Sequence, residues 1–483
     1  MIDFLPRETR HSIAMPSLKS LATAAALLAV LVPSAACGVE PIELPAEKAE
    51  VDGCALLRPT PELPDPTRLG GFDKKRDRAR WTFTAPGGIY RMLIHVRCQY
   101  GSKGFEGRIA DLPFSGFFPQ SLDFTDFDAG LVELANGSNL LEIGGGWGHY
   151  EITGVALRPA VVPPPPAAGP AVPVDPHATA EARALLAALA ANYGKRVLTG
   201  QTEEGDFKAI QAASDRTPAI FASDLMFHSP SMVEHQGPRP KLIDAVLRKA
   251  GEGHVISLLW HWNAPKDLID TPQQRWWTGF YAKGTTFDFA AALDPAHPDH
   301  ALLLRDIDAI AGVLRKLDAA KVPVLWRPLH ECESGGFWWG SKGPEPFKRL
   351  WRLLFERLTQ HHQLHNLIWV HTSEDAAWYP GDDVVDIVCA DTYPDAPGDA
   401  LVARWEPLRK RFDGRKMLAL GEFPGVPDIP HMNRLGVHWA WFCSWKGALG
   451  PARKSPPELI RRVYQSDGVV TLDKLKPYLK EKR

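Results

Sequence analysis

The feature that most constrains the fold is a repeated alternation of short apolar segments with longer helical patterns after residue 177. Helical periodicity is expected at residues 178–193, 241–251, 302–319 and 347–360. Strands are expected at residues 196–199, 218–222, 254–259, 322–327, 367–370, 387–390, 417–420 and 439–442. Eight such alternations predict an α/β chain closed into a (β/α)8 TIM barrel, because an open doubly wound sheet typically needs fewer strands.

A proline-rich segment at residues 161–176 separates this region from the preceding part of the chain. It contains the run Pro163-Pro164-Pro165-Pro166, a composition that favours an extended spacer. Upstream, short β-prone runs at residues 80–84, 89–97 and 140–143 are broken by Gly, Pro, Asn and Asp. We therefore expect a small β-sandwich at residues 67–160, the spacer at 161–176 and the barrel at 177–483.

The first residues have the pattern of an export signal. Lys19 is followed by the apolar run 21–32 and by small residues at 34–36, which predicts a signal peptide at residues 1–36, with Met15 as a possible start. Residues 37–66 are expected to form an N-terminal linker. No other apolar stretch is long enough for a membrane span, so we expect a secreted, periplasmic or cell-surface protein. Cys37 is an alternative point of attachment for a lipid anchor.

The balance of charge argues against a charged partner. With 55 basic and 57 acidic residues, the chain has no electrostatic case for nucleic acid or an anionic membrane surface. Its 16 tryptophans suit a neutral sugar ligand, because their flat rings stack on sugar faces, although they also fill cores.

The cysteines do not form a disulfide framework or a zinc pattern. Cys54 and Cys98 fall in the same N-terminal region and are expected as a possible pair. Cys332, Cys389 and Cys443 lie in apolar strand contexts, which predicts buried thiols.

Polar and aromatic residues follow the predicted strands, where a barrel of this kind has its active site. They are Trp260 to Asn263, His330, Glu331, His371, Glu374, Asp391, Tyr393, Glu422 and Trp445. Glu331 and Glu422, after strands four and seven, face each other across the barrel, an arrangement that suits glycosidic hydrolysis by two carboxyl groups. The alternative is that both are ordinary polar residues satisfied at strand ends.

The residues around this pair resemble the motifs of glycoside hydrolase family 26. The segment 327–331, Arg-Pro-Leu-His-Glu, and the segment 335–340, Gly-Gly-Phe-Trp-Trp-Gly, carry the resemblance at the fourth strand. It extends over residues 177–483, with matches at 200–201, 261–263, 391–393 and 421–423. The resemblance implies a (β/α)8 barrel, double displacement with retention, and endo-β-1,4-mannanase activity on mannan, glucomannan or galactomannan.

The resemblance also implies roles for individual residues, with no metal or cofactor in the scheme. Glu331 matches the acid/base, Glu422 the nucleophile and Tyr393 a hydrogen-bond donor to the nucleophile. The expected sugar contacts are His261, His330, the floor residue Trp445, and the cleft residues Trp262, Trp338 and Trp339. For each of these the alternative is a supporting or core role. Gly336 stands where family members often carry a further Trp, which puts one sugar platform in doubt.

The N-terminal half resembles carbohydrate-binding module family 35. The similarity lies in residues 88–96, 131–141 and 145–152, and it implies a sugar-binding sandwich. Trp147 and Tyr150 are the rings expected to bind sugar, with packing inside the sandwich as the alternative. Thr153-Gly154 replaces an Asp common in that family, so the ligand and any calcium site stay open.

Two kinds of alternative function stay open at this point. The same family includes β-1,3-xylanases and mixed-linkage β-glucanases, which share the mechanism. A non-catalytic polysaccharide-binding protein is a different class, but such proteins usually lose one of the two carboxylates, and both are present here.

Overall fold

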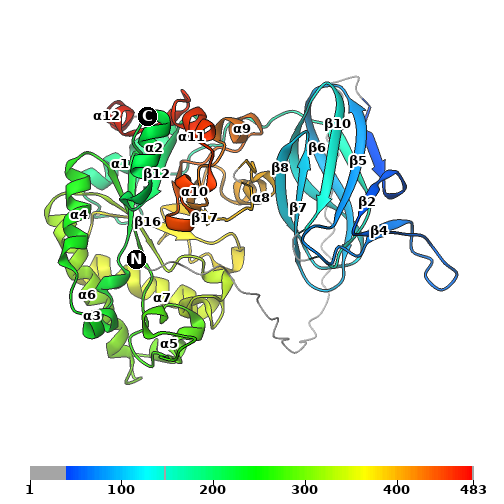
Figure 1. Cartoon of the computed structure of the whole chain (residues 1–483). Coiled ribbons are helices and arrows are strands. Elements are labelled where there is room, and N and C mark those ends of the chain that lie inside the picture. The colour runs from blue at the N-terminus through cyan, green and yellow to red at the C-terminus, as the bar shows by residue number, and fades with distance from the viewer. Residues whose placement is uncertain (1–39, 146–147, 397, 481–483) are drawn as a thin grey trace.

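The computed structural model describes residues 40–145, 148–396 and 398–480. An antiparallel β-sandwich and a parallel barrel lie side by side in it (Figure 1). The predicted signal peptide, Cys37 and Trp147 lie outside the described residues. Within these ranges, none of the helices combines the length and the apolar character that crossing a bilayer requires.

The sandwich consists of two antiparallel sheets. One sheet contains β3 (Ala55–Leu57), β4 (Arg68–Gly70), β11 (Glu151–Pro159), β6 (Gly88–Cys98) and β9 (Ser121–Leu134), with β1 (Ile42–Pro45) paired to β11. The other contains β2 (Glu50–Asp52), β5 (Arg78–Ala85), β10 (Gly137–Gly144), β7 (Lys103–Ile109) and β8 (Leu112–Phe118). In β6 buried and half-buried residues alternate from Ile89 to Cys98, as expected of a strand with one face on a core.

The barrel is a closed ring of parallel strands. In ring order it contains β12 (Val197–Thr202), β13 (Ile220–Asp224), β14 (Val255–Trp260), β15 (Val324–Pro328), β16 (Leu367–Thr372), β17 (Ile387–Asp391), β18 (Met417–Phe423) and β19 (Trp441–Ser444). β12 pairs with both β13 and β19 and so closes the ring, while β20 (Val469–Val470) extends it at β12. All eight predicted strands and the predicted fold class are confirmed.

Helices surround the barrel (Figure 1). Those of the described residues are α1 (Ala180–Asn192), α2 (Phe207–Ser214), α3 (Pro230–Gln236), α4 (Pro240–Gly251), α5 (Phe289–Ala292), α6 (His300–Ala319), α7 (Pro344–Glu356), α8 (Val402–Phe412), α9 (Ile429–Arg434), α10 (Pro451–Lys454), α11 (Pro457–Tyr464) and α12 (Leu472–Lys480). The barrel strands are buried along nearly their whole length, which explains why they read as continuous apolar runs. The four helical patterns expected from the sequence correspond to α1, α4, α6 and α7.

The expected linker at residues 37–66 differs from the structure. Residues 42–57 supply β1, β2 and β3, which pair with β11, β5 and β4. Strands of three or four residues are too short to show a periodic pattern, so the sequence did not reveal them.

The proline-rich segment is extended, as expected. It is not a free spacer, because hydrogen bonds attach it to the barrel. The backbone N–H of Ala167 donates to Asp413 at 2.7 Å, and that of Val174 donates to Asp386 at 2.7 Å. Arg409 of α8 donates to the carbonyl of Pro164 at 2.7 Å. An extended chain leaves its backbone groups free for such bonds, and here the barrel supplies the partners.

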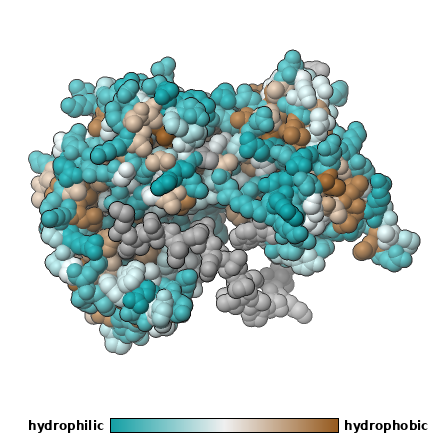
Figure 2. Space-filling model, in the orientation of Figure 1, coloured by the Kyte–Doolittle hydropathy of each residue, from teal (hydrophilic) through white to brown (hydrophobic). Residues whose placement is uncertain are grey.

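The sandwich and the barrel share an interface. Leu131 of β9 is buried in the apolar core of the barrel. Arg91 of β6 makes two hydrogen bonds to Glu406 of α8, at 2.8 and 2.9 Å. Gly130 lies so close to α8 that a Cβ there would meet Val402 at 2.5 Å. On the face shown in Figure 2 most of the surface is hydrophilic, and apolar residues form small separate groups.

The expected Cys54–Cys98 pair is not formed. Both are buried thiols, which donate to the carbonyls of Arg78 and Gly101 at 3.1 and 3.0 Å. The expectation that Cys332, Cys389 and Cys443 are buried and free is confirmed.

Candidate active site

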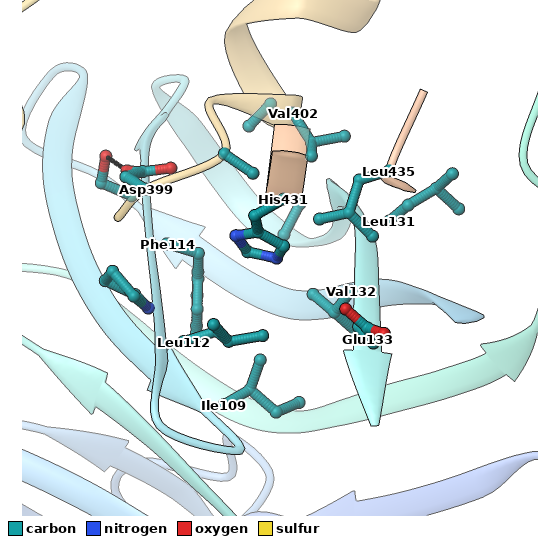
Figure 3. Close-up of a pocket in the computed structure, with 15 residues that line it drawn as sticks. Ile109, Leu112, Phe114, Leu131, Val132, Glu133, Asp399, Val402, His431 and Leu435 are labelled. Atoms are coloured by element: carbon teal, nitrogen blue, oxygen red, sulfur yellow. Dashed lines mark hydrogen bonds between the residues drawn. The ribbon is translucent and has the colours of Figure 1, made fainter. Parts of the chain in front are cut away.

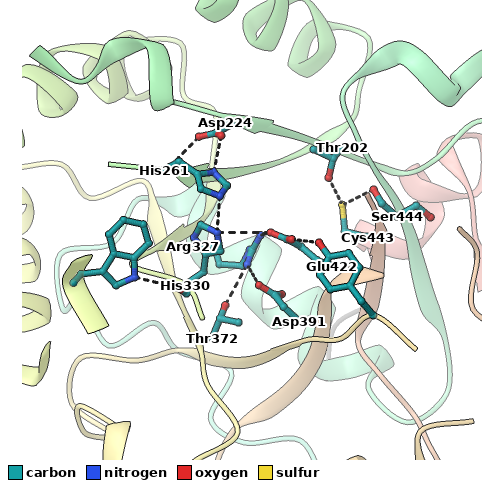
Figure 4. Close-up of polar contacts among 12 residues, drawn as sticks. Thr202, Asp224, His261, Arg327, His330, Thr372, Asp391, Glu422, Cys443 and Ser444 are labelled. Carbon is teal, nitrogen blue, oxygen red and sulfur yellow. Dashed lines mark hydrogen bonds and ion pairs between the residues drawn. The ribbon is translucent and has the colours of Figure 1, made fainter. Parts of the chain in front are cut away.

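The carboxyl ends of the barrel strands bring the predicted residues to one mouth (Figure 4). His261 follows β14, and His330 and Glu331 follow β15. Asp391 ends β17, with Tyr393 two residues later, and Glu422 lies in β18. Strands of a parallel barrel end on the same face, so residues far apart in the sequence meet here.

Glu331 and Glu422 form a close pair of carboxylates. Side-chain oxygens of Glu331, Asp391 and Glu422 lie within 4.8 Å of one another. Retaining glycosidases hold their carboxyl groups about 5–5.5 Å apart, whereas inverting ones need about 6.5–9.5 Å to admit a water. The approach of one oxygen from each carboxyl group to within 4.8 Å is compatible with the shorter spacing of retaining enzymes. Glu331 is half-buried and Glu422 is buried, which leaves Glu331 the more accessible of the two.

Arg327 supplies the positive charge among these carboxylates. Its guanidinium donates to Asp391 at 2.5 Å and also to Glu422, and it is itself buried. Tyr393 donates its hydroxyl to the other oxygen of Glu422. Three carboxylates within this distance would suit a cation, but the guanidinium already occupies the space between two of them.

The carboxylate cluster favours holding a proton. Burial raises the pKa of Asp391 well above its usual range; Arg327 acts against this, and the charges of Glu422 and Glu331 add to it. One guanidinium beside three carboxylates leaves negative charge uncompensated, and a buried site disfavours that state.

Asp224, at the end of β13, orients the two histidines. Its Oδ2 accepts the Nδ1–H of His261 at 2.7 Å, and its Oδ1 accepts the backbone N–H groups of Met226 and His261 at 2.9 and 3.1 Å. Burial opposes ionisation, but the charge and hydrogen bonds of His261 outweigh it and lower the pKa of Asp224. Because a carboxylate only accepts, the proton of His261 is fixed on Nδ1.

The histidines continue this chain of contacts toward Glu422. The Nε2 atoms of His261 and His330 are 3.3 Å apart, and Nε2 of His330 lies 4.0 Å from Glu422 Oε1. Burial lowers the pKa of His330 well below its usual range, with His261 and Arg327 acting in the same direction. His330 is therefore neutral and can donate from only one ring nitrogen.

Comparison with known proteins agrees with this geometry. Residues 174–474 match the family model of Glycosyl hydrolase family 26. A mannan endo-1,4-beta-mannosidase of Thermothelomyces thermophilus is 39% identical over 413 residues, which cover 84% of each chain. The chain belongs to glycosyl hydrolase family 26. It is thus a glycoside hydrolase, as the paired carboxylates predict.

The family relationship extends to structures with both domains. The crystal structure of a GH26-CBM35 β-(1,4)-mannanase of Podospora anserina superimposes with a TM-score of 0.66 at 36% identity, covering 91% of this chain and 99% of that chain. A β-mannanase from a symbiotic protist of the termite Reticulitermes speratus superimposes with a TM-score of 0.57 at 28% identity, covering 64% of this chain and 98% of that one. The first superposition covers enough of this chain to include the sandwich as well as the barrel. The second covers 64% of this chain, which is about the length of the barrel domain.

Three tryptophans expected to line the cleft of this family 26 enzyme are core residues instead. Trp262 and Trp339 are fully buried and Trp338 is 1% exposed, so none of them presents a face to a sugar. Trp338 donates to the carbonyl of Trp262 at 2.6 Å, and Trp339 donates to the carbonyl of His330 at 2.9 Å. They hold the loop after β15, where Leu329 and Glu331 adopt positive φ angles of 50° and 51°. Such angles are strained for these residues and need this support.

Trp445 lies beside the histidines, as expected of a floor residue. Its ring centroid is 6.4 Å from that of His261, and 7% of the residue is exposed. Phe337, which was not among the predicted residues, lies 5.4 Å from His261 on another side. The predicted sugar contacts of Trp445, His261 and Tyr393 are compatible with these positions and remain predictions. His330 is 1% exposed, and its predicted sugar contact also remains a prediction.

The ring chosen for sugar binding in the sandwich is a core residue. Tyr150 is 1% exposed and stacks on Phe72, with ring centroids 4.7 Å apart. The prediction that it binds sugar is wrong, because both faces of a buried ring are taken by protein. Trp147 lies outside the described residues, so the prediction for it stands as made.

Two residues of the site were missed at the sequence level. Arg327 was part of the motif but was assigned no role, because a buried strand position seldom carries a charge. Asp224 lies two residues after the predicted end of the second strand, and the rule that strand-end polar residues face the mouth would have found it.

Proposed function

We propose that this protein is a retaining endo-β-1,4-mannanase that hydrolyses internal bonds of mannan, glucomannan or galactomannan. The observation that carries the proposal is the close approach of Glu331 and Glu422 at the mouth of the barrel, where one carboxylate oxygen of each lies within 4.8 Å of the other. The substrate class is supported by the names of relatives that align over most of the chain, all of them mannan endo-1,4-beta-mannosidases.

In the first step Glu422 attacks the anomeric carbon while the bond from that carbon to the leaving oxygen breaks. Glu331 gives its proton to that oxygen, and a covalent glycosyl-enzyme forms. In the second step a water attacks the same carbon, Glu331 takes the proton of the water, and Glu422 leaves as a carboxylate. Two inversions restore the original β configuration.

The neighbouring groups support these two roles. Arg327 and Tyr393 donate to opposite oxygens of Glu422, which holds this carboxylate in a fixed orientation for attack. His261 and His330 lie in contact beside Glu422, where we expect them to hydrogen-bond hydroxyl groups of the reacting sugar. No group outside these side chains and water is required by the scheme.

The roles of the carboxylates are tested by two variants with different signatures. Glu331→Ala should lose most activity on mannan but retain relatively more on an aryl glycoside with an activated leaving group, which needs little protonation. Glu422→Ala should be inactive on both, and added azide should restore turnover by entering the vacated space as an external nucleophile. Equal losses of Glu331→Ala on both substrates, or absence of azide rescue in folded Glu422→Ala, would contradict the assignment.

The substrate is tested with a panel of polysaccharides. Galactomannan, glucomannan, β-1,3-xylan and mixed-linkage β-glucan are incubated with the protein, and released reducing ends and product sizes are measured. We expect a range of oligosaccharides from the first two. Preferential cleavage of β-1,3-xylan or mixed-linkage β-glucan would replace mannan as the substrate while leaving the mechanism in place.

We further propose that the sandwich binds polysaccharide and that the protein is exported. The P. anserina protein with a CBM35 supports the first point, and the export-signal pattern of residues 1–36 supports the second. Glu422→Ala, which cannot degrade its ligand, should sediment with insoluble mannan, and Trp147→Ala in that background should sediment less. Fractionation of cells tests export, and Cys37→Ser should release the protein from membranes if Cys37 carries a lipid.

A further inference from the structure

The segment between β17 and α8 links the active site to the sandwich. Tyr393, whose hydroxyl donates to Glu422, lies at its start. Two residues later Asp395 forms an ion pair with Lys75 of the sandwich. Two residues span at most about 7 Å of extended chain, so the contact with the sandwich is close to the contact with Glu422.

A second and stronger contact lies further along the segment. Asp399 is 3% exposed and accepts the hydroxyl of Ser115, in β8 of the sandwich, at 2.5 Å. The same carboxylate accepts the backbone N–H of Leu401 at 2.7 Å, directly before α8. The Lys75–Asp395 pair has both side chains more than half exposed and is weak by comparison, because water screens it.

The surroundings of Asp399 are packed by both domains. Phe114 and Leu131 of the sandwich and Val402 and Leu435 of the barrel line a cavity of about 20 Å³ beside it (Figure 3). That volume holds about one water molecule, so side chains of both domains pack closely around Asp399.

The sandwich also reaches the loop after β15. Arg404 of α8 lies over the ring of Phe117 in β8, 5.2 Å from its centroid, and donates to Glu374 at 2.6 Å. The backbone N–H of Glu374 donates to Glu333 at 2.9 Å, two residues after Glu331. Contacts of β8 therefore reach the neighbourhood of both carboxylates. Ser115 bonds Asp399 on the segment that carries Tyr393 beside Glu422, and Phe117 contacts Arg404, which bonds Glu374 beside the loop of Glu331.

We propose that the sandwich is a structural part of the active site, with Ser115 as a positioning residue that holds, through Asp399, the segment carrying Tyr393 against Glu422. The inference rests on the proposed function, because that function gives Tyr393 and Glu422 their roles. It differs from a binding role of the sandwich, since it requires no contact between sandwich and substrate.

The test uses the full chain and a short soluble substrate, mannopentaose, for which attachment to an insoluble polysaccharide is irrelevant. Ser115→Ala should lower kcat about 5- to 20-fold, because displacements well below 1 Å at a catalytic group already slow the reaction. KM should change less than about twofold, because the sugar contacts remain. The acidic limb of the pH–kcat profile should move to higher pH, since a hydroxyl donor favours the ionised nucleophile.

Two matched variants separate positioning from general stability. Ser115→Thr keeps the hydroxyl and should recover most of kcat. Ser102→Ala removes a hydroxyl that bonds only within the sandwich, to the carbonyl of Phe118 at 2.9 Å, and should behave as wild type. Hydrogen exchange of residues 392–396 and 398–401 should rise in Ser115→Ala and stay unchanged in Ser102→Ala.

Several outcomes would overturn the inference. Wild-type kcat and pH profile in Ser115→Ala would do so, and so would equal losses in Ser115→Ala and Ser102→Ala. If Ser115→Ala does not fold, Ser115→Cys, of similar size with a weaker donor, is judged by the same criteria. A wild-type chain that leaves mannopentaose intact but cleaves another polysaccharide of the panel would show failure of the mannan proposal alone, and the variants are then compared on that substrate.

Discussion

Asp224→Asn should slow the enzyme by changing which nitrogen of His261 carries the proton. Oδ1 of Asp224 accepts two backbone N–H groups, and Oδ2 accepts the Nδ1–H of His261. In the variant the single amide oxygen stays with the backbone donors, so the amide nitrogen faces His261. An amide nitrogen only donates, and His261 must then carry its proton on Nε2.

The change passes to the second histidine. If His261 donates from Nε2, then His330 must accept at its own Nε2, 3.3 Å away, and carry its proton on Nδ1. That Nδ1 is buried and has no hydrogen-bond partner among the described residues. A buried donor left without an acceptor costs about 1–3 kcal/mol. At about 1.36 kcal/mol per factor of ten, kcat/KM should fall about 5- to 150-fold.

Asp306→Asn is the matched control for this prediction. Asp306 is also fully buried, and it accepts the indole N–H of Trp262 at 2.8 Å, next to His261. An asparagine oxygen can keep that bond while its nitrogen turns toward Arg305, whose side chain is 37% exposed. Loss of this ion pair should lower folding stability but leaves the hydrogen bond of Asp224 to His261 unchanged, so kcat/KM should change less than about fivefold, or about 1 kcal/mol. If folded Asp224→Asn also stays within that range, the tautomer argument is refuted.

Three further predictions concern the surroundings of the site. Burial raises the pKa of Asp399 to about 6, above its ordinary 3.8, so the folded state keeps this proton longer than the unfolded state as pH rises. The free energy of unfolding of wild type should therefore fall relative to that of Asp399→Asn between about pH 4 and 6, by up to about 3 kcal/mol. Urea unfolding of both proteins at each pH measures this difference. A difference that does not change with pH would argue against a buried, protonated Asp399. Gly421→Ala would place a Cβ 2.5 Å from Asp391, and should cost about 1–3 kcal/mol in thermal unfolding and most of the activity. Gly312→Ala, with open space around it, should be neutral or stabilising, and equal effects of the two would contradict the close-packing argument. Tyr393→Phe should lower kcat about 10- to 100-fold and move the acidic limb of the pH–rate profile upward, and an unchanged limb would show that its hydroxyl does not act on the nucleophile.

The barrel could be predicted from the sequence because its strands are buried on both faces. The segment at residues 417–420, for example, is continuously apolar and corresponds to β18, which is buried over its whole length. The site could be predicted because parallel strands end on one face, so that Glu331 and Glu422 had to meet.

The remaining features depend on packing that local patterns do not record. Trp262 and Trp445 both follow barrel strands, yet the first is fully buried, whereas the second keeps 7% of its surface exposed beside His261. Which face of a ring meets protein is decided by loops from elsewhere in the chain. The contact between Ser115 and Asp399 joins residues 284 positions apart in two domains, and neither residue stands out in its own segment.

The most direct test of the central claim, that Glu331 and Glu422 act as a retaining pair on β-mannan, is the stereochemistry of the first product. Proton NMR of a mannan-oligosaccharide digest, recorded within the first minutes, resolves the anomeric signals before mutarotation mixes them. The short spacing of the two carboxylates predicts that the β-anomer forms first. Initial formation of the α-anomer would contradict the nucleophilic role of Glu422.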